Sequence, residues 1–530
     1  MRKLFYVVLL SLFCVNTWSV PARRVTKVYV LQDGSQQELT LTGDEFGHCF
    51  LSADGKAFLM DKDGIMQPVS TDEISSRRQT RSLQSNRARK MRRNMTFHGM
   101  KKGLVILVNF ADKEFVTTSP QTTLSRIFNE KGYFAGSVHD YFYDQSYGLF
   151  DLEFDVVGPY TLSHDMVYYG ENNSKGDDKR AATMISEACY MADKDVDFNS
   201  YDWDSDGEVD QVYVIYAGYS EAEGAKSTTI WPHEWDLDSA VSIHDGNGSF
   251  KLDGVVINTY ACSSELQGTR GSRISGIGTA CHEFAHCLGL PDMYDTTGNA
   301  FGMDSWDLLD YGCYNNDGHT PAPFTSYERM FCGWLTPIVI TGPVKVEGLG
   351  PITFSPVAYI IYNKAYPNEF YMLENHQQQS WDKYSYGHGL LVVHVDYDEI
   401  AWLDNSVNDK ASHQRMTIVP ADNSLSNRNL AGDPFPGTGG NTSLTNTTQP
   451  AAKLYNANAD GQKFLSCPIT HIQETADGFI SFETDGDQTD ITHIEAEQTV
   501  SCFFDLLGRQ LSSRPSSGYY FHNGKKFKVK

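Results

Sequence analysis

The chain has 530 residues, of which 40% are hydrophobic and 12% aromatic, so it can bury a core and wholesale disorder is excluded. Its length allows about three or four domains. The 67 acidic and 43 basic residues give a formal net charge of −24, which excludes the basic footprint of a nucleic-acid-binding protein and favours bound divalent cations. The 10 cysteines are too sparse for a disulfide scaffold.

The N-terminus has the layout of a secretory signal peptide. A short basic start precedes an apolar run from Leu4 to Phe13 and a cleavable step at Val20-Pro21-Ala22. The run is too short to span a bilayer, and no later segment is apolar enough to do so. We therefore expect residues 1–22 to be a signal peptide, with export to the outside of the cell or its surface and no transmembrane segment. A buried helix or a membrane anchor is the alternative.

The next segment predicts a small β module followed by a linker. From Lys27 to Val69, short apolar runs alternate with Asp-Gly turns. The stretch from Ser75 to Arg93 is then rich in serine and arginine, although the chain is acidic overall. Because exposed segments of this kind are where proteases cut, we interpret residues 23–93 as a β propeptide with a processing linker. A solvated linker without a role in processing is the alternative interpretation.

The longest part of the chain predicts an α+β domain followed by a mainly β region. Leu104–Phe110 and Val212–Ala217 are buried-strand patterns, and apolar residues between Ala181 and Ala192 recur at helical spacing. These elements place a domain over residues 94–337. Short strands separated by proline and glycine then predict a β-rich domain over residues 338–485.

A His-Glu-x-x-His pattern with a following Gly and Asp indicates a zinc site. His282 and His286 are four residues apart, so on a helix they share one face and can bind one Zn²⁺ ion. Gly289 lets the chain leave the helix, and Asp292 can fold back as a third ligand. One position then stays open for water, as catalytic zinc requires. A surface helix with two solvated histidines is the alternative.

Glu283 supplies the proton chemistry that such a site needs. It lies beside both histidines in the sequence and can reach a water on the metal. A zinc ion lowers the pKa of that water to about 7, and a carboxylate can take the proton and hand it to the leaving amine. The sequence therefore predicts metal-assisted peptide hydrolysis with Glu283 as the general base.

Several motifs around the zinc pattern resemble those of secreted zinc metallopeptidases of the immune inhibitor A family (M6). The resemblance covers roughly Gly103 to Phe482 and implies a metzincin-like catalytic fold, a zinc cofactor and endopeptidase activity on proteins or peptides. By position it implies His282, His286 and Asp292 as ligands and Glu283 as the base. The motifs that carry it are Leu288–Asp295, Ile230–His233, Ser305–Gly312, Gly387–Asp396 and Gly432–Gly437.

One position departs from that family pattern. Metzincin-like enzymes place a methionine turn beneath the metal, whereas this chain has Leu309 at the matching position and Met303 in another register. Leucine and methionine have similar volumes, so an apolar floor is retained.

An aspartate-rich segment indicates a calcium loop without an EF-hand. Asp202, Asp204 and Asp206 alternate before Gly207, which permits a sharp turn, and Asp210 is the ninth position. Carboxylates this close repel one another unless a cation lies between them, so we expect Ca²⁺ here. An acidic surface turn is the alternative.

Three further sites have a functional and a structural interpretation each. His233-Glu234 is a second His-Glu pair with no following ligand, and a structural role is favoured. Tyr314 could donate a hydrogen bond to an oxyanion, but an aromatic residue there is more often core. His48-Cys49 could hold zinc and keep the enzyme silent, but a lone cysteine is more often buried.

The C-terminal residues 486–530 resemble type IX sorting domains of Bacteroidetes through Phe503–Arg509 and Gly518-Tyr519-Tyr520. This resemblance implies export machinery as a partner. The sequence as a whole predicts a secreted zinc endopeptidase. The alternatives are a non-catalytic, calcium-stabilised surface adhesin on the same fold and a zinc hydrolase that acts on something other than peptides.

Overall fold

The computed structural model describes residues 19–484 apart from 46, 71–72, 75–96, 174–175 and 242–245, and beyond 484 it describes the backbone of a few short strands. Most of the expected signal peptide, most of the expected processing linker and the side chains of the expected sorting segment therefore lie outside the described residues. The C-terminal strands are β21 (Thr492–Glu495), β22 (Phe503–Phe504), β23 (Gln510–Leu511), β24 (Gly518–His522) and β25 (Lys525–Val529).

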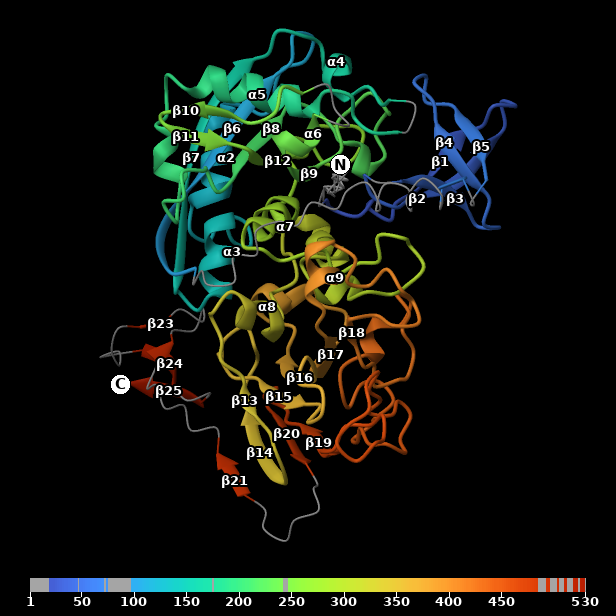
Figure 1. Cartoon of the computed structure of the whole chain (residues 1–530), viewed down its shortest axis with the longest axis vertical. Coiled ribbons are helices and arrows are strands. Elements are labelled where there is room, and N and C mark those ends of the chain that lie inside the picture. Colours follow the sequence, from blue (N-terminus) through green and yellow to red (C-terminus); the bar gives the residue numbers. More distant parts are fainter. Residues whose placement is uncertain are drawn as a thin grey trace, which may run out of the picture.

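The apolar runs between residues 27 and 69 form a five-stranded antiparallel meander, which we call the N-terminal module. Its Asp-Gly turns need glycine, because Gly34, Gly55 and Gly64 have φ between 81° and 86°. The module lies to one side of the molecule (Figure 1). Its strands are β1 (Thr26–Val30), β2 (Gln36–Thr42), β3 (Cys49–Ser52), β4 (Ala57–Met60) and β5 (Met66–Val69).

The upper part of the molecule is built on a mixed sheet in the order β7-β6-β8-β12-β9, in which only the edge strand β9 is antiparallel. The sheet is buried on both faces, as the continuous apolar run of its central strand predicts. Its strands are β6 (Gly99–Asn109), β7 (Phe150–Thr161), β8 (Val212–Tyr216), β9 (His233–Asp236) and β12 (Thr259–Ser264).

Alternate residues of β6 divide between two hydrophobic cores. Leu104 and Ile106 pack in the core that contains α5 (Ala181–Ala192), whereas Val105 and Leu107 face the core that contains α7 (Gly278–Cys287). The other elements here are α2 (Pro120–Asn129), α3 (Val138–Gln145), α4 (Met166–Gly170), η1 (Phe198–Tyr201), η2 (Glu221–Glu223), α6 (Leu237–Ala240), β10 (Phe250–Leu252) and β11 (Val255–Ile257).

The lower part contains two more sheets, ordered β13-β15-β16-β17-β18 and β19-β20-β14-β21. Its strands are β13 (Ile338–Val339), β14 (Val344–Leu349), β15 (Tyr359–Tyr362), β16 (Glu369–His376), β17 (Gly389–Asp396), β18 (Met416–Ile418), β19 (Ile469–Glu474) and β20 (Ile480–Thr484). The short helices are η3 (Asp304–Trp306), η4 (Tyr311–Gly318), α8 (Ser326–Phe331), η5 (Ser380–Tyr384), α9 (Glu399–Leu403) and η6 (Leu430–Gly432).

The two parts share one hydrophobic core around α7, which lies between them in the middle of the molecule (Figure 1). Phe284 and Leu309 belong to the same buried cluster as Met372 and Leu391 of the lower sheet. The expected mixture of helices and strands is therefore confirmed, and packing is continuous across the boundary that the sequence places at residue 337.

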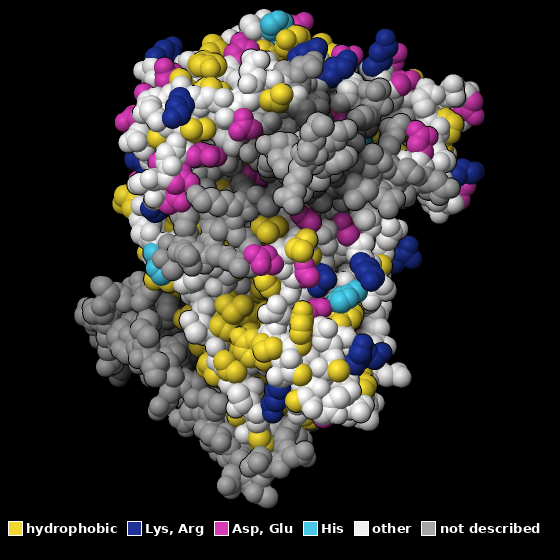
Figure 2. Space-filling model, in the orientation of Figure 1, with side chains coloured by type: hydrophobic (Ala, Val, Ile, Leu, Met, Phe, Trp, Pro, Cys, Tyr) yellow, Lys and Arg dark blue, Asp and Glu magenta, His cyan; other side chains and the backbone are white. Residues whose placement is uncertain are grey.

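The described surface carries both signs of charge. On the face drawn in Figure 2, lysine and arginine side chains are scattered among acidic ones over the upper part of the molecule. A group of hydrophobic side chains lies lower on the same face. Within the residues whose placement is described, no helix has the length and apolar character needed to cross a membrane.

Candidate functional site

Helix α7 is held in one position by close packing. Every residue from Ala280 to Cys287 is buried, and the ring of Phe284 stacks on Tyr213 with centroids 5.2 Å apart. At the start of the helix, a Cβ on Gly278 would lie 1.8 Å from the carbonyl oxygen of Cys313, so only glycine fits against η4. At its end, Gly289 has a φ of 89° and lets the chain turn back.

That turn brings three candidate metal ligands together. Oδ1 of Asp292 lies 3.1 Å from Nε2 of His282 and 3.5 Å from Nε2 of His286. All three side chains are fully buried, and His282 Nε2 and Asp292 Oδ1 make no hydrogen bond. Two imidazoles and one carboxylate that converge in this way suit a divalent metal ion with an open fourth position.

The other ring nitrogens fix the tautomers that metal binding needs. His282 Nδ1 lies 2.9 Å from the carbonyl oxygen of Leu308, and His286 Nδ1 lies 2.8 Å from that of Leu290. Each Nδ1–H therefore donates to a backbone oxygen, which leaves the Nε2 lone pairs for a metal.

A residue that sequence reasoning missed orients Asp292. The amide nitrogen of Asn405 donates to Asp292 Oδ2 at 2.7 Å, and its amide oxygen accepts from the backbone N–H of Asp292 at 2.8 Å. Asn405 follows α9 in the lower part of the molecule, 113 positions further along the chain. No local pattern around Asn405 could have pointed to this role.

The segment that follows η3 forms an apolar floor beneath the histidines. Leu308 and Leu309 are fully buried, and the N–H of Met293 donates to the carbonyl oxygen of Leu309 at 2.8 Å. Asp307 fixes this turn by accepting the N–H of Leu309 at 2.7 Å. Met303 is buried in the same cluster, so the floor is apolar with leucine at the position where the family pattern has methionine.

Glu283 lies next to the three candidate ligands and is fully buried. Burial, followed by the carboxylates of Asp292 and Glu234, raises the pKa of Glu283 well above its usual range. A cation bound by the neighbouring ligands would offset this repulsion. The amide nitrogen of Gln211 donates to the Glu283 backbone carbonyl at 3.0 Å and holds this part of α7 to the sheet.

The chain's own N-terminal segment, Ser19–Ala22, packs beside Glu283. The backbone N–H of Val20 donates to Glu283 Oε1 at 3.3 Å, and the backbone carbonyl of Val20 accepts from Trp231 Nε1 at 3.3 Å. The carbonyl of Ser19 accepts from the Tyr294 hydroxyl at 2.8 Å. Val20 and Ala22 are fully buried. These residues have the sequence pattern of the end of a signal peptide, which gives no sign of this contact.

Tyr314 contacts the same segment. Its hydroxyl donates to the carbonyl oxygen of Pro21 at 2.8 Å. Tyr314, which follows the floor segment, therefore binds the carbonyl of Pro21, the residue after the one whose N–H contacts Glu283.

His233 has a structural environment. Its Nδ1 lies 2.7 Å from the carbonyl oxygen of Trp231, and its Nε2 lies 3.1 Å from the Tyr260 hydroxyl. Burial lowers the pKa of His233 to about 4.

The idea that His48-Cys49 ligates zinc is wrong. Cys49 packs in a separate cluster with Ala57 and Ile74. The ring of His48 stacks on Trp231, with centroids 4.6 Å apart. The contacts near the candidate ligands come instead from Ser19 and Val20, which precede the N-terminal module, and from Glu45 within it. The buried thiol packs within the module's own sheet.

The structure brings together three of the four expected calcium ligands. Oxygens of Asp202, Asp204 and Asp210 lie within 4.8 Å of one another. Gly207, with a φ of 90°, donates its N–H to Asp202 Oδ2 at 3.0 Å. Asp206 is outside this cluster, and its Oδ1 accepts the N–H of Glu208 at 3.0 Å.

Comparisons with known proteins agree on one class of enzyme. Residues 98–334 match the family model described as immune inhibitor A peptidase M6, catalytic domain. The chain is 25% identical over 234 residues to the pre-pro-metalloprotease PrtV of Vibrio cholerae, a match that covers 39% of this chain and 25% of that protein. It is 26% identical over 276 residues to immune inhibitor A of Bacillus thuringiensis, covering 43% of this chain and 39% of that protein. The chain thus spans between a quarter and two fifths of these relatives' lengths.

Proposed function

We propose that this protein is an exported, zinc-dependent endopeptidase acting on protein substrates, because residues 98–334 match the family model of the M6 peptidase catalytic domain. The observation that carries the proposal is the convergence of His282, His286 and Asp292 beside Glu283, whose carboxylate accepts a hydrogen bond from a peptide backbone. This donor set suits zinc, because two imidazoles and one carboxylate with an open position are typical of catalytic sites. The signal-peptide layout of residues 1–22 supports export.

When bound, the zinc ion would lower the pKa of a water molecule and polarise the scissile carbonyl. Glu283 takes a proton from the attacking water and returns it to the leaving amine, so that water is added across the peptide bond to give a carboxylate and an amine. Val20 N lies 3.3 Å from Glu283 Oε1, where the nitrogen of a leaving amine would lie. Tyr314 orients the substrate through the next carbonyl, as it does with Pro21 at 2.8 Å.

We also propose that the secreted form is latent. Arg23 and Arg24, just before the module, pair with Glu223 and Asp304 of the peptidase part, and Leu39 and Phe50 of the module lie in the same buried cluster as Phe284 of α7. Removal of the module by cleavage in the linker before Gly103 would open the site. The name of the Vibrio cholerae relative, a pre-pro-metalloprotease, is consistent with a leader and a propeptide.

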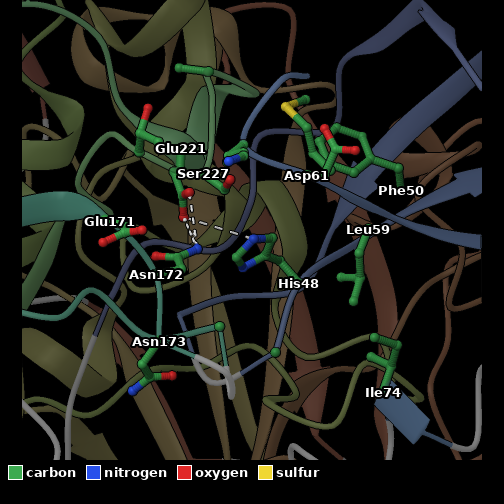
Figure 3. A pocket seen from close by; sticks show the side chains of 16 residues that line it. His48, Phe50, Leu59, Asp61, Ile74, Glu171, Asn172, Asn173, Glu221 and Ser227 are labelled. Carbon is green, nitrogen blue, oxygen red and sulfur yellow. Dashed lines mark hydrogen bonds and ion pairs between the residues drawn. The ribbon is translucent and has the colours of Figure 1, made fainter. Parts of the chain in front are cut away.

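The interface between the module and the peptidase part contains both buried apolar contacts and an open pocket. A cavity of about 330 Å³ lies between β3 and β4 of the module and the loops around Asn172 and Glu221 (Figure 3). His48 enters it, with Nε2 3.8 Å from Glu221 Oε2. The pocket is open to solvent, whereas Leu41, Phe50 and Met66 of the module belong to the same buried cluster as Phe284 of α7.

Calcium would stabilise the domain without taking part in the chemistry. The carboxylates of Asp202, Asp204 and Asp210 lie within reach of one cation, and their loop leads directly into β8 of the central sheet. A cation there would tie the loop to the sheet.

The test compares casein or gelatin cleavage by the full chain and by a form that begins near Asn94. We expect the shorter form to cleave, a zinc chelator to abolish the cleavage and added zinc to restore it, and the full chain to be nearly inactive. A chelator-insensitive activity would contradict the zinc assignment. A folded, zinc-loaded shorter form that cleaves neither protein would favour the alternative of a non-catalytic adhesin.

A further inference from the structure

Two arginines follow directly after Ser19–Ala22 and pair with acidic residues of the peptidase part. Arg23 Nη1 lies 3.2 Å from Glu223 Oε2, and its other terminal nitrogen contacts Asp317. Arg24 Nη1 lies 2.6 Å from Asp304 Oδ2. The Arg24 guanidinium also lies 3.4 Å from the centre of the Tyr311 ring, a close cation–π contact. We call the pair Glu223 and Asp317 the first acidic site, and Asp304 with Tyr311 the second.

Both acidic sites belong to the peptidase part and would remain after removal of the module. Asp304 is 1% exposed, and Asp310, which is fully buried, accepts its backbone N–H at 2.7 Å. In the first site Glu223 also accepts the N–H of Gly268 at 2.6 Å, and Asp317 pairs with Arg273 at 2.9 Å. Buried carboxylates favour a cationic partner, because an unpaired buried charge is costly. Loss of Arg24 would leave Asp304 in need of another cation.

The position of the arginines relative to Glu283 defines a register. The N–H of Val20 donates at 3.3 Å to Glu283 Oε1, the carboxylate that would protonate a leaving amine, so we take Val20 as the counterpart of the first residue after a cleaved bond. The segment is also bound through its backbone, since the N–H of Arg23 donates to the carbonyl of Ala222 at 2.8 Å. Arg23 and Arg24 are then the fourth and fifth residues after that bond.

Resting on the proposed peptidase function, we propose that the processed enzyme prefers polypeptides with two adjacent basic residues at the fourth and fifth positions after the cleaved bond. Glu223 with Asp317 recognises the fourth side chain, and Asp304 with Tyr311 the fifth. In the full chain, Arg23 and Arg24 hold the places of these substrate side chains.

The chain contains a second segment with the same spacing. It has three adjacent arginine pairs, Arg23-Arg24, Arg77-Arg78 and Arg92-Arg93. In Val20-Pro21-Ala22-Arg23-Arg24 and in Ile74-Ser75-Ser76-Arg77-Arg78, a β-branched aliphatic residue precedes the pair by the same number of positions. A peptide that copies Val69–Thr80 is therefore a substrate taken from the chain itself, with cleavage expected between Glu73 and Ile74.

The experiment measures kcat/KM of the processed form on this peptide and on a matched peptide with alanine in place of both arginines, with cleavage positions read by mass spectrometry. We expect the arginine peptide to be cleaved before Ile74 with kcat/KM at least about tenfold higher, because charge-assisted hydrogen bonds to carboxylates are strong. Glu223→Gln and Asp304→Asn should each shrink the ratio between the two peptides. Glu153 is exposed on β7, at the edge of the central sheet opposite β9, and serves as a control. Glu153→Gln should leave the ratio unchanged.

The ratio of kcat/KM for the two peptides is measured within each variant, so a smaller amount of folded enzyme does not change this ratio. Equal kcat/KM for the two peptides in an enzyme that cleaves casein would overturn the preference, and the acidic sites would then only anchor the module. Cleavage at other bonds, at rates that do not depend on the arginines, would overturn it as well. A processed form that cleaves neither peptide nor casein would instead overturn the proposed function.

Discussion

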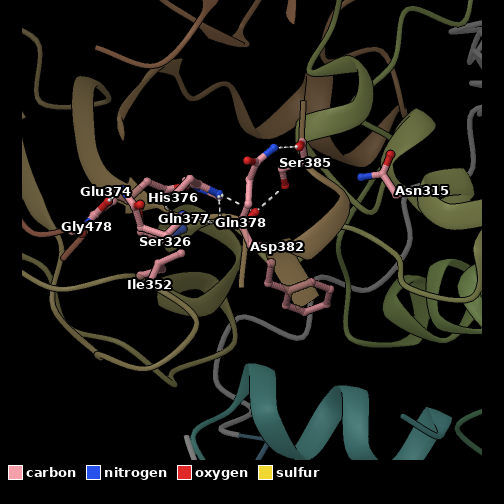
Figure 4. Close-up of polar contacts among 12 residues, drawn as sticks. Asn315, Ser326, Ile352, Glu374, His376, Gln377, Gln378, Asp382, Ser385 and Gly478 are labelled. Carbon is pink, nitrogen blue, oxygen red and sulfur yellow. Dashed lines mark hydrogen bonds and ion pairs between the residues drawn. The ribbon is translucent and has the colours of Figure 1, made fainter. Parts of the chain in front are cut away.

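His376 is a buried cation that connects the lower sheet to the floor of the candidate metal site. Its Nε2 lies 2.8 Å from Glu374 Oε1, and its Nδ1 lies 3.0 Å from Asp382 Oδ1 (Figure 4). The ring of Trp306 meets the imidazole edge to face at 5.8 Å, just before the chain enters the floor segment at Leu308. Loss of the positive charge on His376 would therefore disturb the packing of the floor segment beneath the candidate metal site.

The surroundings of His376 determine the size and sign of its contribution to the free energy of unfolding. Burial alone would lower the pKa of His376, but the charges of Asp382 and Glu374 outweigh burial and raise it to about 10. From an ordinary value of about 6.5, and at about 1.4 kcal/mol per pH unit, this corresponds to roughly 5 kcal/mol of stability as an order of magnitude. Because the folded-state pKa is raised, the contribution is complete below about pH 6.5 and is lost as the pH rises through about 10.

We predict that the free energy of unfolding, from urea titrations between about pH 7 and about pH 9.5, falls more steeply in the wild type than in His376→Gln. The slope attributable to His376 should approach about 1.4 kcal/mol per pH unit. His388→Gln removes an exposed histidine that pairs with Glu474 and should leave the slope unchanged. The same slope in the wild type and in His376→Gln would refute the reasoning.

Three further predictions follow from the candidate sites. Asn405→Ala should weaken zinc binding by about ten- to a hundredfold in a chelator competition, because Asp292 loses both of its orienting hydrogen bonds; unchanged affinity would contradict that role. Calcium in millimolar excess should raise the Tm of the wild type but not of Asp202→Asn, because a ligand that binds only the native state stabilises it. Equal shifts of Tm in the two proteins would show that this segment is an ordinary acidic turn. Cys49→Ser should leave the full chain as latent as the wild type, because the thiol packs with Ala57 and Ile74; a gain of activity would restore the thiolate hypothesis.

The sequence predicted the parts of the site that local spacing encodes. His282, Glu283 and His286 share a helix, and Gly289 returns the chain to Asp292, so an i, i+4 pattern and one turn were sufficient to group them. The strands of the N-terminal module and of the central sheet were likewise visible in alternating or continuous apolar runs.

The contacts that join distant segments could not be predicted in this way. Asn405 reaches Asp292 from the other part of the molecule, and Val20 reaches Glu283 across a sequence separation of 263 residues. Ser19–Ala22 also resembles the end of a signal peptide, so its local pattern predicts a cleavage site and not a contact with Glu283. The thiol chemistry of Cys49 suits a zinc ligand, whereas its strand directs it into the module's own core.

Zinc content and substrate turnover, determined together on the same preparation of the processed form, test the central claim most directly. The account predicts stoichiometric zinc in the wild type and in Glu283→Ala, because the metal is held by His282, His286 and Asp292. Turnover should fall at least about a hundredfold in Glu283→Ala, because the general base is lost. A Glu283→Ala variant that retains zinc and cleaves at close to the wild-type rate would contradict the assignment of the site.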